Sequence, residues 1–395
     1  MKKHLQNIGI DGKKVVLRSD FNVPIKGGKI LDSNKIDLSL ETIKYLLEHN
    51  CSIVILSHFG RVKTEDDKRN NTLLPVADYL SKTLNTNVMF STDTRSIALD
   101  NAVASMKPKE ILLLENTRFE DISGNLESGN DAQLAAYWAS LGEIFVMDAF
   151  ASAHRAHAST VGITKFLPSC MGFLMQKELD MLEKLTVNLE KPFTVMMGGA
   201  KIEDKLELLD ALVPRCDYLL LSGGLANTCL KALGFYVASS LVSNDPDILE
   251  KIKTLMLNNR NKIMLPLDAI VGNTYNKDYA DYKLINEIET DDVIYDIGMK
   301  TIDKYKTAID ASKTIFVNGT VGMYEDTKFA NGTREVLNVL AKCSATVVIG
   351  GGDSVSAVTN LGFKGKFANI CSGGGATLEY LVKASLPGID AIEEE

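Results

Sequence analysis

Short apolar runs alternate with helical patterns along the whole chain, and this alternation constrains the fold more than any other feature. The runs have the length of buried strands, whereas the residues between them, such as Ile202, Leu206, Leu209, Leu212 and Val213, recur at helical spacing. The runs cover residues 15–17, 53–56, 111–114 and 144–147 in the first half, and 194–197, 218–221, 263–265, 314–317, 346–349 and 368–371 in the second. Such alternation predicts an α/β fold with doubly wound parallel sheets.

The length of 395 residues predicts two domains, because one core seldom serves more than about 250–300 residues. We expect an N-terminal domain over residues 1–170 and a C-terminal domain over residues 192–383. Residues 171–191 are rich in Leu, Met, Lys and Glu and are expected to form a connecting helix. Residues 384–395, which contain the turn residues Pro387 and Gly388, are expected to pack back on the first domain.

Composition excludes several classes of protein. A net charge of −8 disfavours nucleic-acid binding, and no apolar run reaches the ~18 residues of a membrane span. The basic start is followed by no apolar stretch, so no secretory signal is expected. The cysteines are scattered, with no C-x-x-C pair, which favours thiols in a reducing cytoplasm; they are Cys51, Cys170, Cys216, Cys229, Cys343 and Cys371.

Polar and basic side chains follow four strands of the first half, where ligands bind in open α/β sheets. The segments begin at Arg18, Ser57, Glu115 and Asp148. They deliver a cluster of basic groups, together with Asp20 and Asn22 for hydroxyl groups; the basic members are His58, Arg61, Arg118 and Arg155. Because arginine binds phosphate and carboxylate through two parallel hydrogen bonds, the cluster predicts a small anionic ligand that carries hydroxyl groups.

Each of these residues also has a plain structural interpretation. A single arginine is most often a surface ion pair, and Asp20 or Asn22 could merely fix a turn. His154 and His157 have a spacing that suits zinc, but zinc needs further ligands. The anion-site hypothesis depends on four separate loops that repeat the pattern.

Several strands of the second half end in glycines and then open a helix. Glycine lets backbone N–H groups approach an anion closely, and a helix N-terminus favours negative charge. The turns contain Gly198, Gly199 and Ala200; Ser222, Gly223 and Gly224; Gly350, Gly351 and Gly352; and Gly373, Gly374 and Gly375. One such turn also serves simple chain reversal, but four in one domain predict a phosphate site.

Two charged residues beside these turns strengthen the prediction. Lys201 opposes the helix dipole in the first turn of its helix, a conflict that a bound polyphosphate removes, and Lys205 lies one turn later. Asp353 follows three glycines; it could be a simple N-cap, but in a nucleotide site it would hold magnesium, which favours carboxylate oxygens alongside phosphates. The P-loop pattern, the dinucleotide-binding G-x-G-x-x-G and the hydrolase G-x-S-x-G are all missing.

These motifs resemble those of the phosphoglycerate kinase family, in the same order and over almost the entire chain. The matching segments are RSDFNVP, LSHFGR, LLENTRFE, DAFASAHRAHAST, GGAKIEDK, SGGLANT, LPLD, DIG, NGTVGMYE, GGGDS and SGGGATLE. The resemblance implies two Rossmann-like domains that face a central cleft and must close for catalysis. It also implies a glycolytic enzyme that is cytoplasmic and monomeric.

The resemblance further implies the reaction and the roles of site residues. The enzyme would move a phosphoryl group between 1,3-bisphosphoglycerate and MgADP, giving 3-phosphoglycerate and MgATP. The acid substrate would be held by Asp20, Asn22, Lys35, His58, Arg61, Arg118 and Arg155. The nucleotide would be held by Gly199, Ala200, Lys201, Lys205, Gly223, Gly224, Gly298, Asn318, Glu325, Gly351, Gly352, Asp353 and Ser354, with Glu325 on the ribose and Asp353 on Mg²⁺. The catalytic set would be Lys35, Lys201, Gly373, Gly374 and Gly375, which stabilise charge on the transferring group.

The chain departs from the family pattern at a few positions. Lys35 stands where the family normally has arginine, Met299 and Thr320 stand where it has proline, and Ser19 stands where valine is usual. Lysine keeps the charge but loses the planar fork. Besides an active kinase, these departures leave open a ligand-binding paralogue with weak or no activity, and an enzyme that uses nucleotide with a different small acid.

Overall fold

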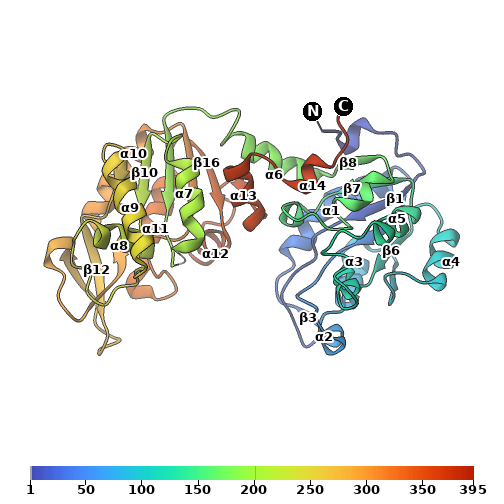
Figure 1. The fold of residues 1–395 in the computed structure, drawn as a ribbon, viewed down its shortest axis with the longest axis horizontal. Helices are drawn as coiled ribbons and strands as arrows, with labels where there is room; N and C mark the ends of the chain where they lie inside the picture. Colours follow the sequence, from blue (N-terminus) through green and yellow to red (C-terminus); the bar gives the residue numbers. More distant parts are fainter. Residues whose placement is uncertain (1, 201) are drawn as a thin grey trace. The chain divides into compact units, whose positions relative to one another are not determined.

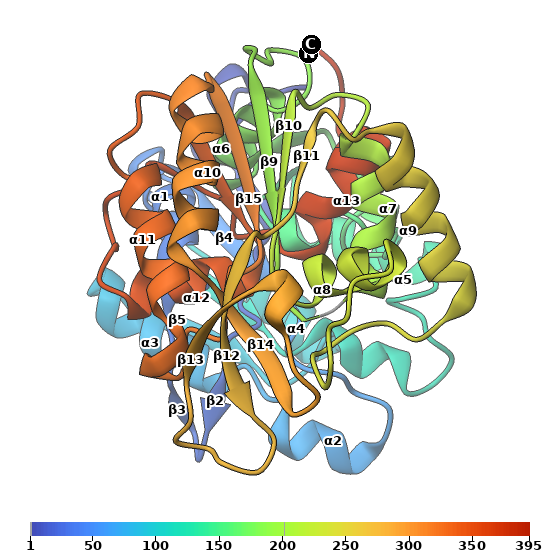
Figure 2. The same cartoon turned by 90° about the vertical axis from the view of Figure 1, so that its left-hand side faces the viewer.

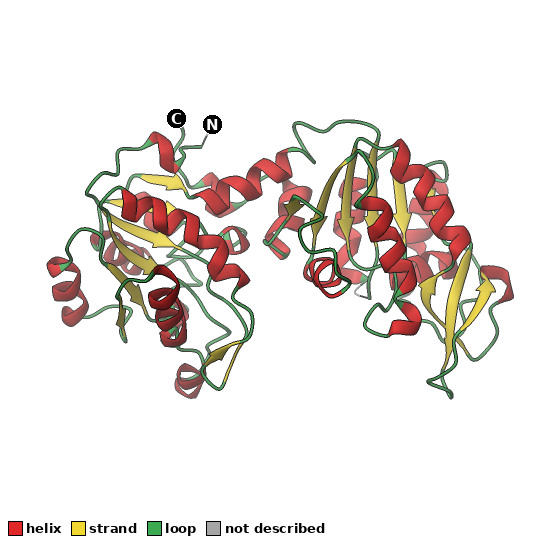
Figure 3. Ribbon diagram, turned by 180° about the vertical axis from the view of Figure 1, so that it is seen from behind, coloured by secondary structure: helices red, strands yellow, loops and turns green. Residues whose placement is uncertain are grey.

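The structure is a computed structural model that describes residues 2–200 and 202–395. Contacts divide the chain into two units: Met1–Asp180 with Ser385–Glu395, and Met181–Ala384 (Figure 1). In the described part of the chain, no helix is both long and apolar enough to cross a membrane. In each unit, strands form a central sheet with helices on both sides (Figure 3).

The first unit contains a six-stranded parallel sheet in the order β5-β6-β4-β1-β7-β8. The strands are β1 (Lys14–Arg18), β4 (Ser52–Leu56), β5 (Val88–Ser91), β6 (Ile111–Leu114), β7 (Ile144–Met147) and β8 (Ser169–Met171). The connection after β1 leads to β4 on one side, whereas β7 and β8 extend the sheet on the other. The order therefore reverses between β1 and β7, where ligands bind in sheets of this type.

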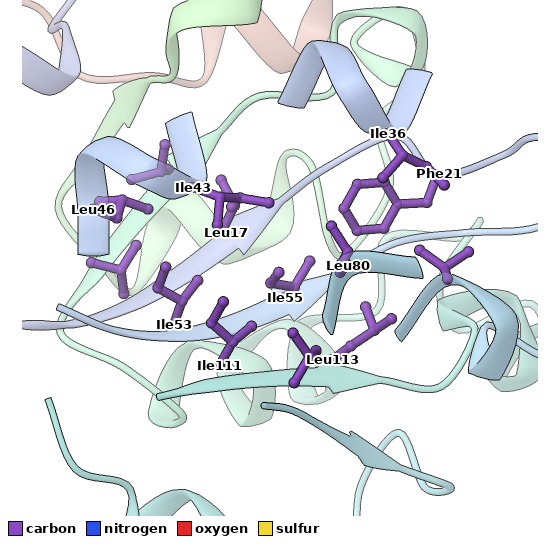
Figure 4. Close-up of a cluster of buried hydrophobic side chains, with 14 of the residues drawn as sticks. Leu17, Phe21, Ile36, Ile43, Leu46, Ile53, Ile55, Leu80, Ile111 and Leu113 are labelled. Atoms are coloured by element: carbon purple, nitrogen blue, oxygen red, sulfur yellow. The ribbon is translucent and has the colours of Figure 1, made fainter. Parts of the chain in front are cut away.

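The central strands of the first unit are apolar runs because both of their faces are covered. Every residue of β4, β6 and β7 is buried. One face packs on a cluster that includes Leu17, Ile43, Ile55, Leu80 and Leu113 (Figure 4). The helices are α1 (Asn34–Glu48), α2 (Glu65–Asn70), α3 (Leu74–Leu84), α4 (Ile97–Ser105) and α5 (Ala132–Ser140), with a short hairpin of β2 (Ile25–Lys26) and β3 (Lys29–Ile30).

The second unit has its own six-stranded parallel sheet, in the order β11-β10-β9-β15-β16-β17. Its strands β11, β10, β9 and β15 are labelled in Figure 2. The strands are β9 (Phe193–Met197), β10 (Tyr218–Leu221), β11 (Ile263–Met264), β15 (Thr314–Asn318), β16 (Thr346–Gly350) and β17 (Asn369–Ile370). The order reverses between β9 and β15, as in dinucleotide-binding sheets. The helices are α7 (Leu206–Leu212), α8 (Gly223–Ala232), α9 (Pro246–Asn258), α10 (Met299–Ala311), α11 (Asn331–Leu340), α12 (Gly352–Asn360) and α13 (Gly375–Lys383).

A small antiparallel sheet in the second unit was not expected. It has the order β13-β12-β14 and consists of β12 (Asp268–Asn273), β13 (Asp281–Leu284) and β14 (Asp292–Ile297). Each strand contains charged or polar residues, so none is a continuous apolar run in the sequence. The LPLD and DIG motifs lie on this sheet, at the start of β12 and the end of β14.

The chain passes twice between the units. The first passage is α6 (Phe173–Glu183), which is shorter than the helix expected over residues 171–191. It ends early because Thr186, Val187 and Asn188 are poor helix formers. The second passage follows α13, after which α14 (Pro387–Asp390) and the last residues belong to the first unit. There a bridge pairs Lys2 with Glu394, and Lys3 lies 2.6 Å from the Glu393 carboxylate.

Candidate functional site

An ion pair lies at the carboxyl end of β1, beside the point where the sheet order reverses. The ammonium of Lys35, from the first turn of α1, is 2.7 Å from Oδ2 of Asp20. Asp20 is buried, which by itself would raise the pKa of its carboxyl group, but the charge of Lys35 and hydrogen bonds from Lys35 and Asn22 outweigh burial and lower the pKa. Asp20 is therefore ionised, and Lys35 is brought into the site that the sequence predicted.

A buried arginine fixes the state of His58. Nη2 of Arg18 lies 3.2 Å from Nδ1 of His58, and guanidinium only donates, so Nδ1 accepts and the proton of the neutral ring is on Nε2. Burial, together with Arg18, Arg118 and Lys35, lowers the pKa of His58 well below its usual value, against the opposing charge of Asp20. His58 thus offers a neutral N–H donor. The sequence pattern did not identify Arg18 as a site residue, although Arg18 is the first residue of the RSDFNVP motif. Its position at the end of a buried strand could have identified it.

The remaining basic side chains gather near Arg118. Burial lowers the pKa of Arg118, and the positive charges of Arg155 and Arg61 lower it further, against the charges of Asp121 and Glu127. Arg61 and Arg155 are exposed, whereas Arg118 donates to the carbonyl of Gly60. Asn22 accepts the N–H of Gly60 at 3.1 Å, so it orders the loop that carries Arg61. The structure therefore brings together the basic residues that the sequence predicted.

A buried carboxylate lies beneath this cluster. Glu127 is fully buried and accepts two hydrogen bonds from Ser159, while Nε of Arg18 donates to the Ser159 hydroxyl at 2.9 Å. Nδ1 of His157 is 3.7 Å from Glu127, and Nε2 of His154 accepts from Arg155. The two histidines thus have different partners, and in the described chain no three His, Cys, Asp or Glu residues form a group suited to a metal.

In the second unit, Lys205 joins the two strands on either side of the sheet reversal. Its ammonium lies 2.9 Å from Oδ1 and 3.0 Å from the carbonyl of Asn318, at the end of β15, and also binds the carbonyl of Gly198, after β9. Lys205 therefore places a positive charge between the β9 and β15 loops. Lys201 lies outside the described residues.

The glycine turns are joined to one another at the same edge of the sheet. Gly224 N–H donates to the carbonyl of Gly199 at 3.1 Å, and Gly319 N–H donates to the hydroxyl of Ser354 at 2.6 Å. Gly199, Gly223, Gly319 and Gly351 have positive φ, which favours glycine, and a Cβ on Gly223 would lie 2.9 Å from the backbone of Gly199. The turns that follow β9, β10, β15 and β16 thus converge, and a larger residue at Gly223 would separate the first two.

Two carboxylates of the small sheet hold further parts of this site. Asp268 accepts the N–H groups of Lys300 and Thr301 at 2.9 and 2.8 Å, which fixes the N-terminus of α10 beside Gly298. Asp296 accepts the N–H of Gly332 at 2.6 Å, and a Cβ on Gly322 would be 2.1 Å from its Oδ1. Burial raises the pKa of Asp296 to about 7. Sequence reasoning missed both roles, although both residues stand in motifs that it quoted.

Asp353 and Glu325 are exposed and lie on the same side as the glycine turns. Burial raises the pKa of the Tyr324 phenol. The negative charge of Glu325 and, less strongly, that of Asp353 raise this pKa further. An added Cβ at Gly352 meets nothing within 4 Å, so the space beside Gly352 is open. The exposed carboxylate of Asp353 fits Mg²⁺, which takes one or two carboxylates and completes its shell with phosphates and water.

The last glycine turn stands apart in the hydrogen-bond network. Gly375 begins α13, Gly374 precedes it with a φ of 54°, and α13 packs on α7. The structure places Gly373, Gly374 and Gly375 at a helix N-terminus, as expected, but gives them no direct contact with Lys205 or Asn318 among the described interactions. The two sheets, the basic cluster and the convergent glycine turns are typical of a two-unit α/β protein that binds anionic ligands.

Comparison with known proteins identifies the family. The sequence model described as phosphoglycerate kinase matches residues 5–383. Phosphoglycerate kinases of Macrococcus caseolyticus and Fusobacterium nucleatum are 43% and 42% identical over 397 and 400 residues, covering 100% of this chain and of each relative.

Solved structures agree with the sequence match. The phosphoglycerate kinase of Coxiella burnetii superposes with a TM-score of 0.90 at 34% identity, over 99% of this chain and 98% of that one. That of Pyrococcus horikoshii OT3 gives 0.84 at 28% identity, over 98% of each. The chain belongs to the phosphoglycerate kinase family, and the comparisons give no support to a non-catalytic paralogue.

Proposed function

We propose that the first unit binds the phosphoglycerate and that the second unit binds MgADP or MgATP at its glycine turns. The residues that would hold the phosphoglycerate are Asp20, Asn22, Lys35, His58, Arg61, Arg118 and Arg155. The observation that carries this is the basic cluster at Arg118, whose charges repel one another. The neighbouring carboxylate of Asp20 is paired with Lys35, so an anionic ligand would relieve the repulsion among these charges. The 3-phosphoglycerate anion supplies a phosphate, a carboxylate and a hydroxyl group that match these donors.

The chemistry needs no general base. A β-phosphate oxygen of ADP, already an anion, attacks the phosphorus of the acyl phosphate in line; the new P–O bond makes ATP, and the bond that breaks leaves 3-phosphoglycerate as a carboxylate. Lys35, Lys201 and the α13 N-terminus at Gly373, Gly374 and Gly375 would stabilise charge on the transferring group. Lys205 and the N–H groups of the glycine turns would hold the polyphosphate of the nucleotide. Mg²⁺ bound at Asp353 would neutralise phosphate charge.

A coupled assay tests the function directly. Purified protein is supplied with 3-phosphoglycerate, MgATP and glyceraldehyde-3-phosphate dehydrogenase, and NADH consumption is followed. We expect turnover of ~1 to 1,000 per second. Binding of both ligands in calorimetry without turnover would instead assign the chain to ligand sensing.

A cytoplasmic location is part of the proposal. It is supported by the thiols of Cys51, Cys170, Cys216, Cys229 and Cys343, which are not in disulfides. The monomeric state stays a prediction.

A further inference from the structure

The side chain of Asn116, at the carboxyl end of β6, makes four hydrogen bonds and is fully buried. Oδ1 accepts the N–H groups of Phe59 and Arg118, each at 3.1 Å. Nδ2 donates to the carbonyls of Phe59 at 2.6 Å and Asn71 at 2.9 Å. An amide has two donors and one oxygen with two lone pairs, so every position is used.

These bonds fix the backbone from which the basic residues project. Phe59 directly follows His58 and lies two residues before Arg61, while Asn71 is at the far end of the same segment. The neighbouring carboxylate of Glu115 accepts Leu73 N–H at 2.9 Å and the Thr72 hydroxyl at 2.6 Å. Both ends of residues 59–73 are therefore held at the end of β6.

The simplest role for Asn116 would be to cap the short helix Thr117–Asp121, and it does accept Arg118 N–H in that way. Capping needs only an acceptor, which Asp or Ser supplies equally well. The two donor bonds run to residues 57 and 45 positions away and contribute nothing to the cap. An amide, rather than a carboxylate or hydroxyl, is required only to hold the distant segment.

We propose that Asn116 is a positioning residue for the acid substrate: it holds the main chain of two loops so that His58, Arg61 and Arg118 converge on one anion. The inference rests on the proposed function of the first unit. The charges of Arg61 and Arg118 repel each other, so without ligand they favour loops that spread apart. The hydrogen bonds of Asn116 already hold both loops in the free protein, so binding pays less of the entropic cost of ordering them.

Asn116→Asp tests this with almost no change of shape. Aspartate keeps both acceptor bonds and the helix cap, but it loses both donors and places a carboxylate oxygen against two carbonyls. We expect calorimetric affinity for 3-phosphoglycerate, measured without nucleotide, to fall at least about tenfold, and the KM for this substrate to rise in parallel. Affinity for MgADP is expected to stay within about twofold, because that site is in the other unit.

Asp131→Ala is the matched control, since it removes the cap that Asp131 provides to α5 in the same unit and touches no basic loop. It is expected to lower the melting temperature and leave both affinities unchanged. If Asn116→Asp also lowers only the melting temperature, the positioning role is wrong. Asn116→Ala, which adds no charge, carries the same expectation if the aspartate variant does not fold. Failure of the unaltered protein to bind 3-phosphoglycerate would instead overturn the proposed function.

Discussion

Lys35 and Asp20 are joined at 2.7 Å, so the ammonium of Lys35, at a position where the resemblance implies an arginine in the family, is committed to a buried carboxylate. A guanidinium could keep that contact with one N–H and turn others toward a ligand, because its five donors are spread over a planar fork. We therefore expect Lys35→Arg to raise kcat/KM for 3-phosphoglycerate about three- to tenfold and to leave the KM for MgATP unchanged. Steady-state kinetics in the coupled assay measure both.

Two further variants serve as controls for this expectation. Lys35→Met removes the main charge that offsets the burial of Asp20, and should lower kcat/KM by about a hundredfold or more. Lys44→Arg, an exposed change on the same helix, should alter nothing. An unchanged kcat/KM in Lys35→Arg would mean that lysine already provides all that the site needs.

Asp148 gives the first unit a pH dependence of stability. Burial raises the pKa of its carboxyl group to about 7, against hydrogen bonds from Thr42, Met175 and Leu174. The carboxyl group ionises near its ordinary pKa in the unfolded chain but only near 7 in the folded one. The contribution of Asp148 to stability is therefore largest below the unfolded pKa and declines as pH rises from about 4 to about 7, by an amount on the order of 2–4 kcal/mol.

Asp148→Asn should flatten that decline, because its amide oxygen can still accept from Leu174 and Met175 and has no proton to lose. Trp138, the only tryptophan of the chain, is buried in the first unit, so its fluorescence during urea unfolding reports this unit. Asp296→Asn is the control, since that carboxyl group also has a pKa raised to about 7 but lies in the second unit. A slope unchanged by Asp148→Asn would show that other groups cause the pH dependence.

Lys205 is expected to govern nucleotide affinity alone. Lys205→Met removes the charge between Gly198 and Asn318 and leaves their carbonyls without this donor, so MgADP affinity should fall at least about tenfold. Calorimetry with MgADP and with 3-phosphoglycerate separates the two sites. Lys251→Met breaks an exposed ion pair with Asp210 and should change neither affinity. Equal loss of both affinities would point to general unfolding.

The contact between Gly388 and Ala153 links the end of the chain to the Arg155 loop. Gly388 N–H donates to the Ala153 carbonyl at 2.8 Å, and an added Cβ would lie 2.9 Å from the Ala153 Cα. Gly388→Ala must displace that backbone, so we expect a cost of about 1–3 kcal/mol and a KM for 3-phosphoglycerate a few-fold higher. Gly9→Ala, where the added Cβ meets nothing, is the control. A lower melting temperature with an unaltered KM would show that the contact between Gly388 and Ala153 stabilises the fold but does not affect substrate binding.

The sequence predicted the parts of the fold that depend on local pattern. β6, β7 and β10 have the predicted limits, because a strand buried on both faces is a continuous apolar run. The basic residues were found because parallel strands bring their carboxyl ends to one edge, so His58 and Arg118 could be placed together without knowledge of the strand order.

What the sequence could not reveal depends on contacts between distant residues. Nothing near Asn116 in the sequence shows that its amide binds the backbone at Phe59 and Asn71. The small sheet was missed because strands such as Asp281–Leu284 are largely polar. Likewise, Asp268 and Asp296 lie in recognisable motifs, but only folding shows that they hold the backbone beside Gly298 and Gly322.

The return of Ser385–Glu395 to the first unit has a consequence for biosynthesis. A ribosome must translate the whole of the second unit before the residues that bind Ala153, Lys2 and Lys3 exist. The N-terminal half thus leaves the exit tunnel with one of its surfaces uncovered, although domains of this size generally fold as they emerge. Completion of the first unit is in this way deferred until the second unit has been made.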